Sequence, residues 1–176
     1  MNYKTISEVY DANDQIRARF KALIGGLTPE QAAMRENGAG WSVAEIVEHV
    51  TIVESGITMI CSRLLAAGAE KGGTLAGEAR ISADFLSKAA ASRGAKLEAP
   101  DRVHPTGTKS IPELLVALDE NRDRLNELQP TFETVDCLEF TFPHPAFGPI
   151  TAHDWLALVG GHDARHIAQI ERVLAG

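Results

Sequence analysis

Apolar residues recur every three or four positions in four long stretches of the chain. Residues spaced in this way share one face of an α-helix, so each stretch predicts an amphipathic helix whose apolar face packs inward. The predicted helices cover residues 7–24, 42–67, 110–129 and 151–174. Three of them begin with a capping box, in which a Ser or Thr is followed three residues later by an acidic side chain, at Ser42, Ser110 and Thr151. The pattern predicts an all-α fold in a single domain, residues 1–176.

The segments between the long helices carry weaker patterns. In chain order we expect a short helix after Thr28, a loop at 68–77, a weaker helix at 79–92, irregular chain at 94–109 and a short extended piece at 134–142. Pro130 is expected to end the third long helix. The insertion between the second and third long helices is rich in loops, and such insertions often shape a substrate entrance.

The last predicted helix carries two histidines, His162 and His166, four residues apart. In a helix this spacing places both rings on one face, one turn apart, where they can reach the same ion. The same face carries the apolar residues Trp155, Val159 and Ile170, so both rings point toward the core. An unpaired buried polar group costs a few kcal/mol. A metal ion would satisfy the two rings, and so would hydrogen bonds within the core.

A third histidine, His49, lies on the apolar face of the second predicted helix, at helical spacing from Ile46, Val50 and Val53. Three inward histidines from two helices can converge between those helices. Three protein ligands leave one position of a tetrahedral ion open, which is typical of catalytic rather than structural metal sites. His153 is nine residues before His162, about half a revolution out of phase, and is excluded as a further ligand.

The stretches WSVAEIVEH (41–49) and HDARHIAQI (162–170), with HPAFGPIT (144–151) before the second, resemble the DinB-like metalloprotein superfamily over nearly the whole chain. The resemblance implies an up-down four-helix bundle that is usually dimeric. It also implies a divalent metal ion, such as zinc or nickel, on His49, His162 and His166. Some members are thiol-dependent transferases or isomerases that use a low-molecular-weight thiol as cosubstrate, and many have no assigned reaction.

A three-histidine shell with an open position suits a thiol-dependent transferase and a hydrolase equally, with water or a thiol on the ion as the reacting group. The alternatives are a non-catalytic bundle that binds a metal or a small ligand, and a bundle whose histidines are purely structural. Two residues are candidate assistants. Arg165 can contact a carboxylate of the protein or of a substrate, or form a surface ion pair. Glu45 can support His49 from one turn away, or serve only as the capping residue of its helix.

Composition narrows the class of protein further. The 17 basic and 24 acidic residues give a net charge of −7 with no sustained basic stripe, which argues against nucleic-acid binding. Charges interrupt the longest apolar stretches and the first residues lack the apolar run of a signal peptide, so neither a membrane span nor secretion is expected. We therefore expect a cytoplasmic protein with a small-molecule substrate. Cys61 and Cys137 are expected to be reduced and buried.

Overall fold

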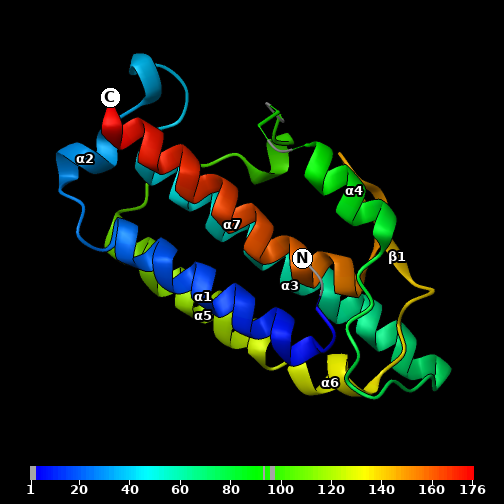
Figure 1. Cartoon of the computed structure of the whole chain (residues 1–176). Coiled ribbons are helices and arrows are strands. Elements are labelled where there is room, and N and C mark those ends of the chain that lie inside the picture. Colours follow the sequence, from blue (N-terminus) through cyan, green and yellow to red (C-terminus); the bar gives the residue numbers. More distant parts are fainter. Residues whose placement is uncertain (1–2, 93, 96–97) are drawn as a thin grey trace.

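The computed structural model describes residues 3–92, 94–95 and 98–176. Four long helices form a bundle: α1 (Ile6–Ile24), α3 (Val43–Lys71), α5 (Ile111–Asn126) and α7 (Ala152–Ala175). Helix α7 packs against α1 and α3, and α3 also packs against α5. In Figure 1, α1 lies beside α5 and α7 lies beside α3, which gives a square arrangement of the four helices. The all-α bundle predicted from the apolar periodicity is confirmed.

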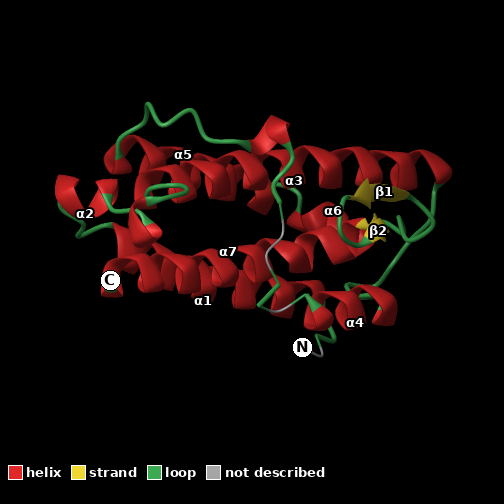
Figure 2. Cartoon of the chain, turned by 90° about the horizontal axis from the view of Figure 1, so that it is seen from above, coloured by secondary structure: helices red, strands yellow, loops and turns green. Residues whose placement is uncertain are grey.

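The shorter elements lie at the two ends and along one side of the bundle. They are α2 (Pro29–Ala33), the 3₁₀ turns η1 (Glu36–Gly38) and η2 (Asp101–Val103), α4 (Ala83–Ala91), α6 (Gln129–Thr134), and the strands β1 (Thr141–His144) and β2 (Gly148–Thr151). The strands pair antiparallel, with Phe142 opposite Ile150. Figure 2 shows this hairpin and α6 at one end of the bundle and α2 at the other.

The helix starts follow the predicted caps. The Ser42 N–H donates to the Glu45 carboxylate at 2.6 Å, and the Glu45 N–H donates back to the Ser42 hydroxyl at 3.2 Å. Thr151 and Asp154 form the same pair of bonds at the start of α7. Each box satisfies backbone N–H groups that have no partner inside the helix.

Two expectations for the chain before α7 were wrong. Helix α5 ends at Asn126 and Pro130 does not end it, because Pro130 lies in the first turn of α6, where a proline loses no helical hydrogen bond. The extended segment lies at 141–151 rather than 134–142, because β1 pairs with β2 across the turn at 145–147, and β2 begins at Gly148, which has φ of +76°. Cys137, within the predicted piece, is instead packed against Gly68 of α3.

Buried apolar side chains form two clusters, one at each end of the bundle. The first cluster includes Tyr10, Ile57 and Leu156. The second includes Phe20, Val50 and Ile170. Each long helix contributes to both clusters. The middle of the bundle, between the two clusters, is occupied by buried polar residues.

Among the helices of the described residues, one helix, α3, is long and apolar enough to cross a membrane by length and composition. In the bundle, the buried face of α3 carries the polar residues Glu48, His49 and Glu54. This face packs against α7 and α5.

Candidate metal centre

Three histidine rings from two helices meet in the middle of the bundle. His49 comes from α3, and His162 and His166 come from α7. One ring nitrogen of each histidine lies within 4.8 Å of the other two, and the Nε2 atoms of His162 and His166 are 3.2 Å apart. The ring centroid of His49 is 5.2 Å from that of His162 and 5.0 Å from that of His166. The structure thus brings together the three histidines that the sequence singled out.

Two neighbouring groups orient the rings. His49 Nδ1 lies 2.8 Å from the carbonyl oxygen of Val103, and His166 Nδ1 lies 2.8 Å from the side-chain oxygen of Gln169. Both partners are acceptors, so each Nδ1 must carry the proton and donate it. The Nε2 of each ring then keeps a lone pair that can accept a proton or bind a metal ion, and that of His166 faces Nε2 of His162. Metal-ligating histidines are commonly oriented in this way.

Burial keeps the imidazoles neutral. His49 and His166 are 4% and 7% exposed, while His162 is partly exposed. Burial lowers the pKa of all three rings, and it brings the pKa of His166 to about 4. The neighbouring histidines and Arg165 lower the pKa values of His162 and His166 further. At neutral pH the cluster therefore consists of neutral imidazoles, which is the form that binds a metal ion.

The spacing of His162 and His166 fits a divalent cation. Metal–nitrogen bonds of about 2.0–2.1 Å in a tetrahedral shell put the ligand nitrogens about 3.3 Å apart. The 3.2 Å between the Nε2 atoms of His162 and His166 matches this spacing. Without an ion, the same distance allows His162 to donate a hydrogen bond from its Nε2 to the Nε2 lone pair of His166, and a bound cation would take the place of that proton.

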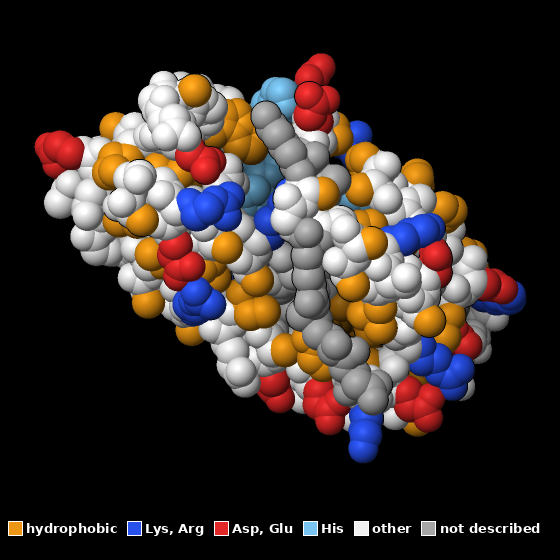
Figure 3. All heavy atoms as spheres, turned by 45° about the horizontal axis from the view of Figure 1, so that its top comes forward, with side chains coloured by type: hydrophobic (Ala, Val, Ile, Leu, Met, Phe, Trp, Pro, Cys, Tyr) orange, Lys and Arg blue, Asp and Glu red, His pale blue; other side chains and the backbone are white. Residues whose placement is uncertain are grey.

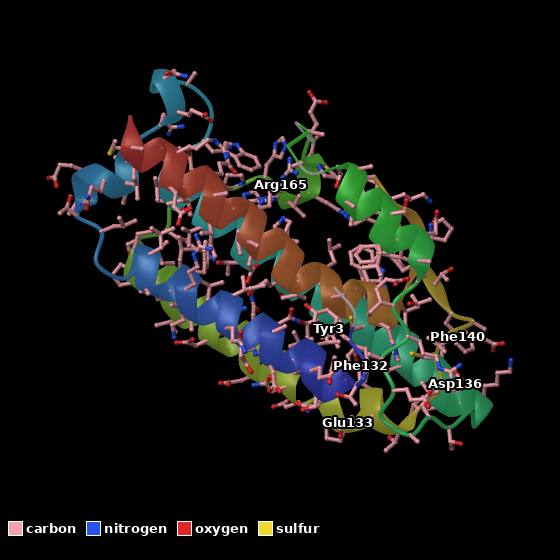
Figure 4. The ribbon with its side chains drawn as sticks, viewed as in Figure 1. Tyr3, Phe132, Glu133, Asp136, Phe140 and Arg165 are labelled. Atoms are coloured by element: carbon pink, nitrogen blue, oxygen red, sulfur yellow. The ribbon has the colours of Figure 1, made fainter. Side chains whose placement is uncertain are left out.

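A covering segment, Ser92 and residues 94–95 and 98–108, lies over this side of the bundle. Arg165 of α7 donates to the backbone carbonyls of Ser92 and Ala95, and Figure 4 shows it on the side of α7 where α4 lies. Glu48, 2% exposed, accepts hydrogen bonds from the Thr106 hydroxyl at 2.7 Å and the Gly107 N–H at 2.8 Å. Figure 3 shows histidine side chains in a hollow of this face. The segment is thus held at two points beside the histidines.

The sequence and the structure were compared with known proteins. A crystal structure described as TT2238, a four-helix bundle protein, superimposes with a TM-score of 0.65 at 21% identity, covering 95% of this chain and 98% of the other. The family model of the DinB superfamily matches residues 12–170, which include His49, His162 and His166. This chain belongs to the DinB superfamily. It is 23% identical over 149 residues to the uncharacterized protein YuaE of Bacillus subtilis (strain 168), across 84% of this chain and 86% of that protein.

DinB superfamily proteins generally bind metal ions, and in this chain three histidines lie together as a group that could hold one. The two candidate assistants have other contacts. Glu45 caps α3 and forms an ion pair with Arg35 at 2.7 Å. Arg165 donates to backbone carbonyls, although its charge still acts on His162 and His166.

Two further ring side chains, Trp41 and His144, lie near the cluster. The ring of Trp41 lies 4.8 Å from that of His49 and 5.6 Å from that of His104, at the edge of the cluster. His144 on β1 stacks on Phe147, with ring centroids 4.4 Å apart, and it is close enough to act on the pKa of His162.

His153, Cys61 and Cys137 take part in the fold rather than in the cluster. His153 is fully buried, and its Nδ1 accepts a hydrogen bond from the Arg80 N–H at 3.0 Å. Cys61 and Cys137 are buried free thiols, as expected. Burial raises the pKa of Cys137 to about 11, so its thiol stays protonated at neutral pH.

The sequence interpretation did not predict that two groups beside the cluster orient the histidines. Gln169, three residues after His166 on the same helix face, orients His166. The signal available in the sequence was its spacing of three residues from His166. Val103 orients His49 through its backbone carbonyl, which any residue would supply, so no side chain marked this position.

Proposed function

We propose that this DinB superfamily protein is a metal-dependent enzyme, of the thiol-dependent transferase or hydrolase type. His49, His162 and His166 would hold one divalent ion, zinc or nickel, with at least one position open to substrate. The observation that supports this proposal is the convergence of three neutral ring nitrogens from α3 and α7, with two of the rings oriented by Val103 and Gln169. Both metals bind imidazole well.

A bound divalent ion would polarise an oxygen ligand or hold a thiol as thiolate, which serves both hydrolysis and thiol transfer. Three neutral imidazoles leave the charge of such an ion uncompensated, and Arg165 adds a further positive charge beside His162. A negatively charged substrate group, such as the thiolate of a low-molecular-weight thiol, is therefore favoured at the open position.

His144 would contribute a hydrogen-bond donor at the edge of the centre. Its Nδ1 accepts from the Ala146 N–H at 3.1 Å, so in the neutral ring Nε2 carries the proton. Burial lowers the pKa of His144 to about 4, which keeps the ring neutral at pH 7. A substrate oxygen near His162 could accept this proton in a hydrogen bond.

The second candidate is a non-catalytic bundle that binds a metal or a small ligand. The observation that favours it is the covering segment, which Glu48 and Arg165 hold over the histidines. The discriminating experiment is a turnover screen with thiol acceptors and esters, using zinc-loaded, nickel-loaded and chelator-treated protein. Turnover that appears only with metal supports the enzyme. Metal binding with no turnover across the panel supports the second candidate.

For the assembly, we propose a cytoplasmic homodimer that contacts neither nucleic acid nor membrane. Met59 on α3 and Val116 on α5 are 60% and 59% exposed, so a partner chain could bury both side chains. The net charge of −7 disfavours nucleic acid.

A further inference from the structure

A layer of buried polar side chains crosses the bundle between the two apolar clusters. All four long helices contribute to this polar layer, whose members are Asn13, Arg17, Glu54, Asn121, Arg122 and Asp163. Burying so many polar groups costs free energy unless they bond to one another or to backbone. The pattern of their bonds indicates what the layer does for the histidines.

Asn13 of α1 is bonded to the backbone of α7. Its side-chain N–H donates to the Leu156 carbonyl at 2.9 Å, and its side-chain oxygen accepts from the Gly160 N–H at 3.1 Å. Leu156 and Gly160 are four residues apart, so these two backbone groups are the pair that an α-helix normally bonds together. The amide of Asn13, 4% exposed, thus bridges one step of the hydrogen-bond ladder of α7.

Gly160 is required for this contact. A Cβ atom at this position would lie 2.4 Å from the side-chain oxygen of Asn13 and 3.0 Å from Cδ1 of Ile16. The first distance is far inside van der Waals contact, and the two helices can approach this closely because position 160 has no side chain. Asn13 and Gly160 therefore fix how deeply α7 lies against α1.

Arg17, one turn after Asn13 on α1, contacts α3, the helix that carries His49. Its guanidinium bonds to Glu54 of α3 and donates to the Leu118 carbonyl of α5 at 2.8 Å. Glu54 and Arg17 are 3% and 6% exposed. One face of α1 thus contacts both of the helices that carry the histidines.

The points of attachment lie on the far sides of those helices from the histidines. At about 100° per residue, Gly160 is about 200° from His162, and Glu54 is about 140° from His49. When contacts with α1 fix the depth and rotation of such a helix, they also fix the position of the histidines on its opposite side. Rotation of α7 would therefore move His162 and His166 relative to His49.

We propose that Asn13 is a positioning residue of the metal centre, whose amide fixes the depth and rotation of α7 so that His162 and His166 meet His49. This inference rests on the proposed metal centre. It assigns to α1, which carries none of the three histidines, a role in the affinity and geometry of the site.

Cobalt(II) is a suitable probe, because its visible absorption reports coordination geometry and it binds the same nitrogen ligands as zinc. We would compare wild type, Asn13→Ala, Gly160→Ala and the double variant Asn13→Ala/Gly160→Ala. The measurements are cobalt affinity by chelator competition, the absorption spectrum, and the melting temperature without metal. Tyr10→Phe is the matched control, because Tyr10 also makes a buried hydrogen bond from α1, at 2.8 Å, but to the Leu125 carbonyl of α5 and not to the backbone of α7.

Asn13→Ala should lower cobalt affinity by about 10-fold or more and change the spectrum. Gly160→Ala should also lower the melting temperature, because its methyl group clashes with Asn13. The double variant removes the clash with the Asn13 amide and leaves only the 3.0 Å contact with the flexible end of Ile16. It should recover the melting temperature but not the affinity or the spectrum. Tyr10→Phe should lower the melting temperature and keep both metal properties.

Wild-type affinity and spectrum in Asn13→Ala and in the double variant would overturn the positioning role while leaving the metal centre intact. A different failure would appear in wild type itself. If wild type binds no more cobalt than His166→Ala, the proposed metal centre is wrong, and the positioning role is wrong with it.

Discussion

A buried imidazole can be a donor, an acceptor or a cation, and its neighbours decide which. Around His49 and His166 the Nδ1 partners are the oxygens of Val103 and Gln169, so each ring donates from Nδ1 and keeps its Nε2 lone pair as an acceptor or a metal ligand. The sequence predicted both rings as inward-facing from their place on apolar helix faces. It did not predict how they are oriented, because one partner is a backbone carbonyl of a distant loop.

Gln169→Leu should weaken metal binding without removing a ligand. Leucine has a similar size but no acceptor for the Nδ1 proton of His166, so the ring loses its fixed orientation. Loss of such a partner typically costs 10–100-fold in metal affinity, and we expect a loss of about 10-fold. Gln169→Glu keeps an acceptor and should bind metal at least as tightly as wild type. Chelator competition with zinc measures both, and equal affinities in wild type and Gln169→Leu would contradict the orienting role.

His153 should make the fold sensitive to acid independently of the metal. Burial lowers its pKa from 6.5 to about 4, so between these values the unfolded chain binds more protons than the folded one. The free energy of unfolding therefore has its full value above about pH 6.5. It falls as the pH drops toward 4, and protonation of His153 in the unfolded chain accounts for up to about 3 kcal/mol of that fall.

His153→Gln removes this titration and keeps an acceptor for the Arg80 N–H. Urea unfolding at pH 7 and pH 4.5, in the presence of a chelator, should show a smaller difference in the free energy of unfolding for His153→Gln than for wild type. Equal differences would show that His153 is not held neutral in the folded state.

At the scale of elements, the long helices could be predicted and the connections could not. Capping boxes such as Ser42–Glu45 and apolar helix faces involve residues close together in the sequence, so they can be recognised before the fold is known. The pairing of β1 with β2, and the contact of Cys137 with Gly68, join residues that carry no mutual signal in the sequence. The same holds for the covering segment, whose place depends on Glu48 reaching Thr106 and Gly107 across more than fifty residues.

Glu48→Ala should loosen the covering segment and speed metal exchange. The variant removes the acceptor of the bonds from Thr106 and Gly107, which lie next to the Val103 carbonyl that orients His49. We expect zinc loss to a chelator to be several-fold faster, because opening of the segment is easier. Asp101→Ala, an exposed change in η2, is the control and should leave the rate unchanged. An unchanged rate in Glu48→Ala would contradict this role of the segment.

At the scale of the whole molecule, the bundle places its chemistry in the polar middle and leaves apolar surface on α3 and α5. Met59 and Val116 are the large apolar residues most exposed among the described residues. Helix α3 is apolar enough to span a membrane by composition, and exposed apolar residues such as Met59 contribute to that composition.

The proposed homodimer should have twice the 18.9 kDa mass of one chain in light scattering at micromolar concentration. Met59→Glu places a charge on the exposed face of α3 and should shift the population toward monomer, because an unpaired buried charge is costly. A wild-type protein that is monomeric at these concentrations would contradict the proposed assembly.

The metal content of protein purified without an affinity tag tests the proposed centre most directly. Elemental analysis should find about one divalent ion per chain in wild type and in His153→Gln, whose substituted residue lies outside the cluster. His166→Ala leaves two of the three nitrogens and should retain little metal after dialysis, because two imidazoles bind an ion weakly. Equal metal occupancy in wild type and His166→Ala would contradict the three-histidine centre.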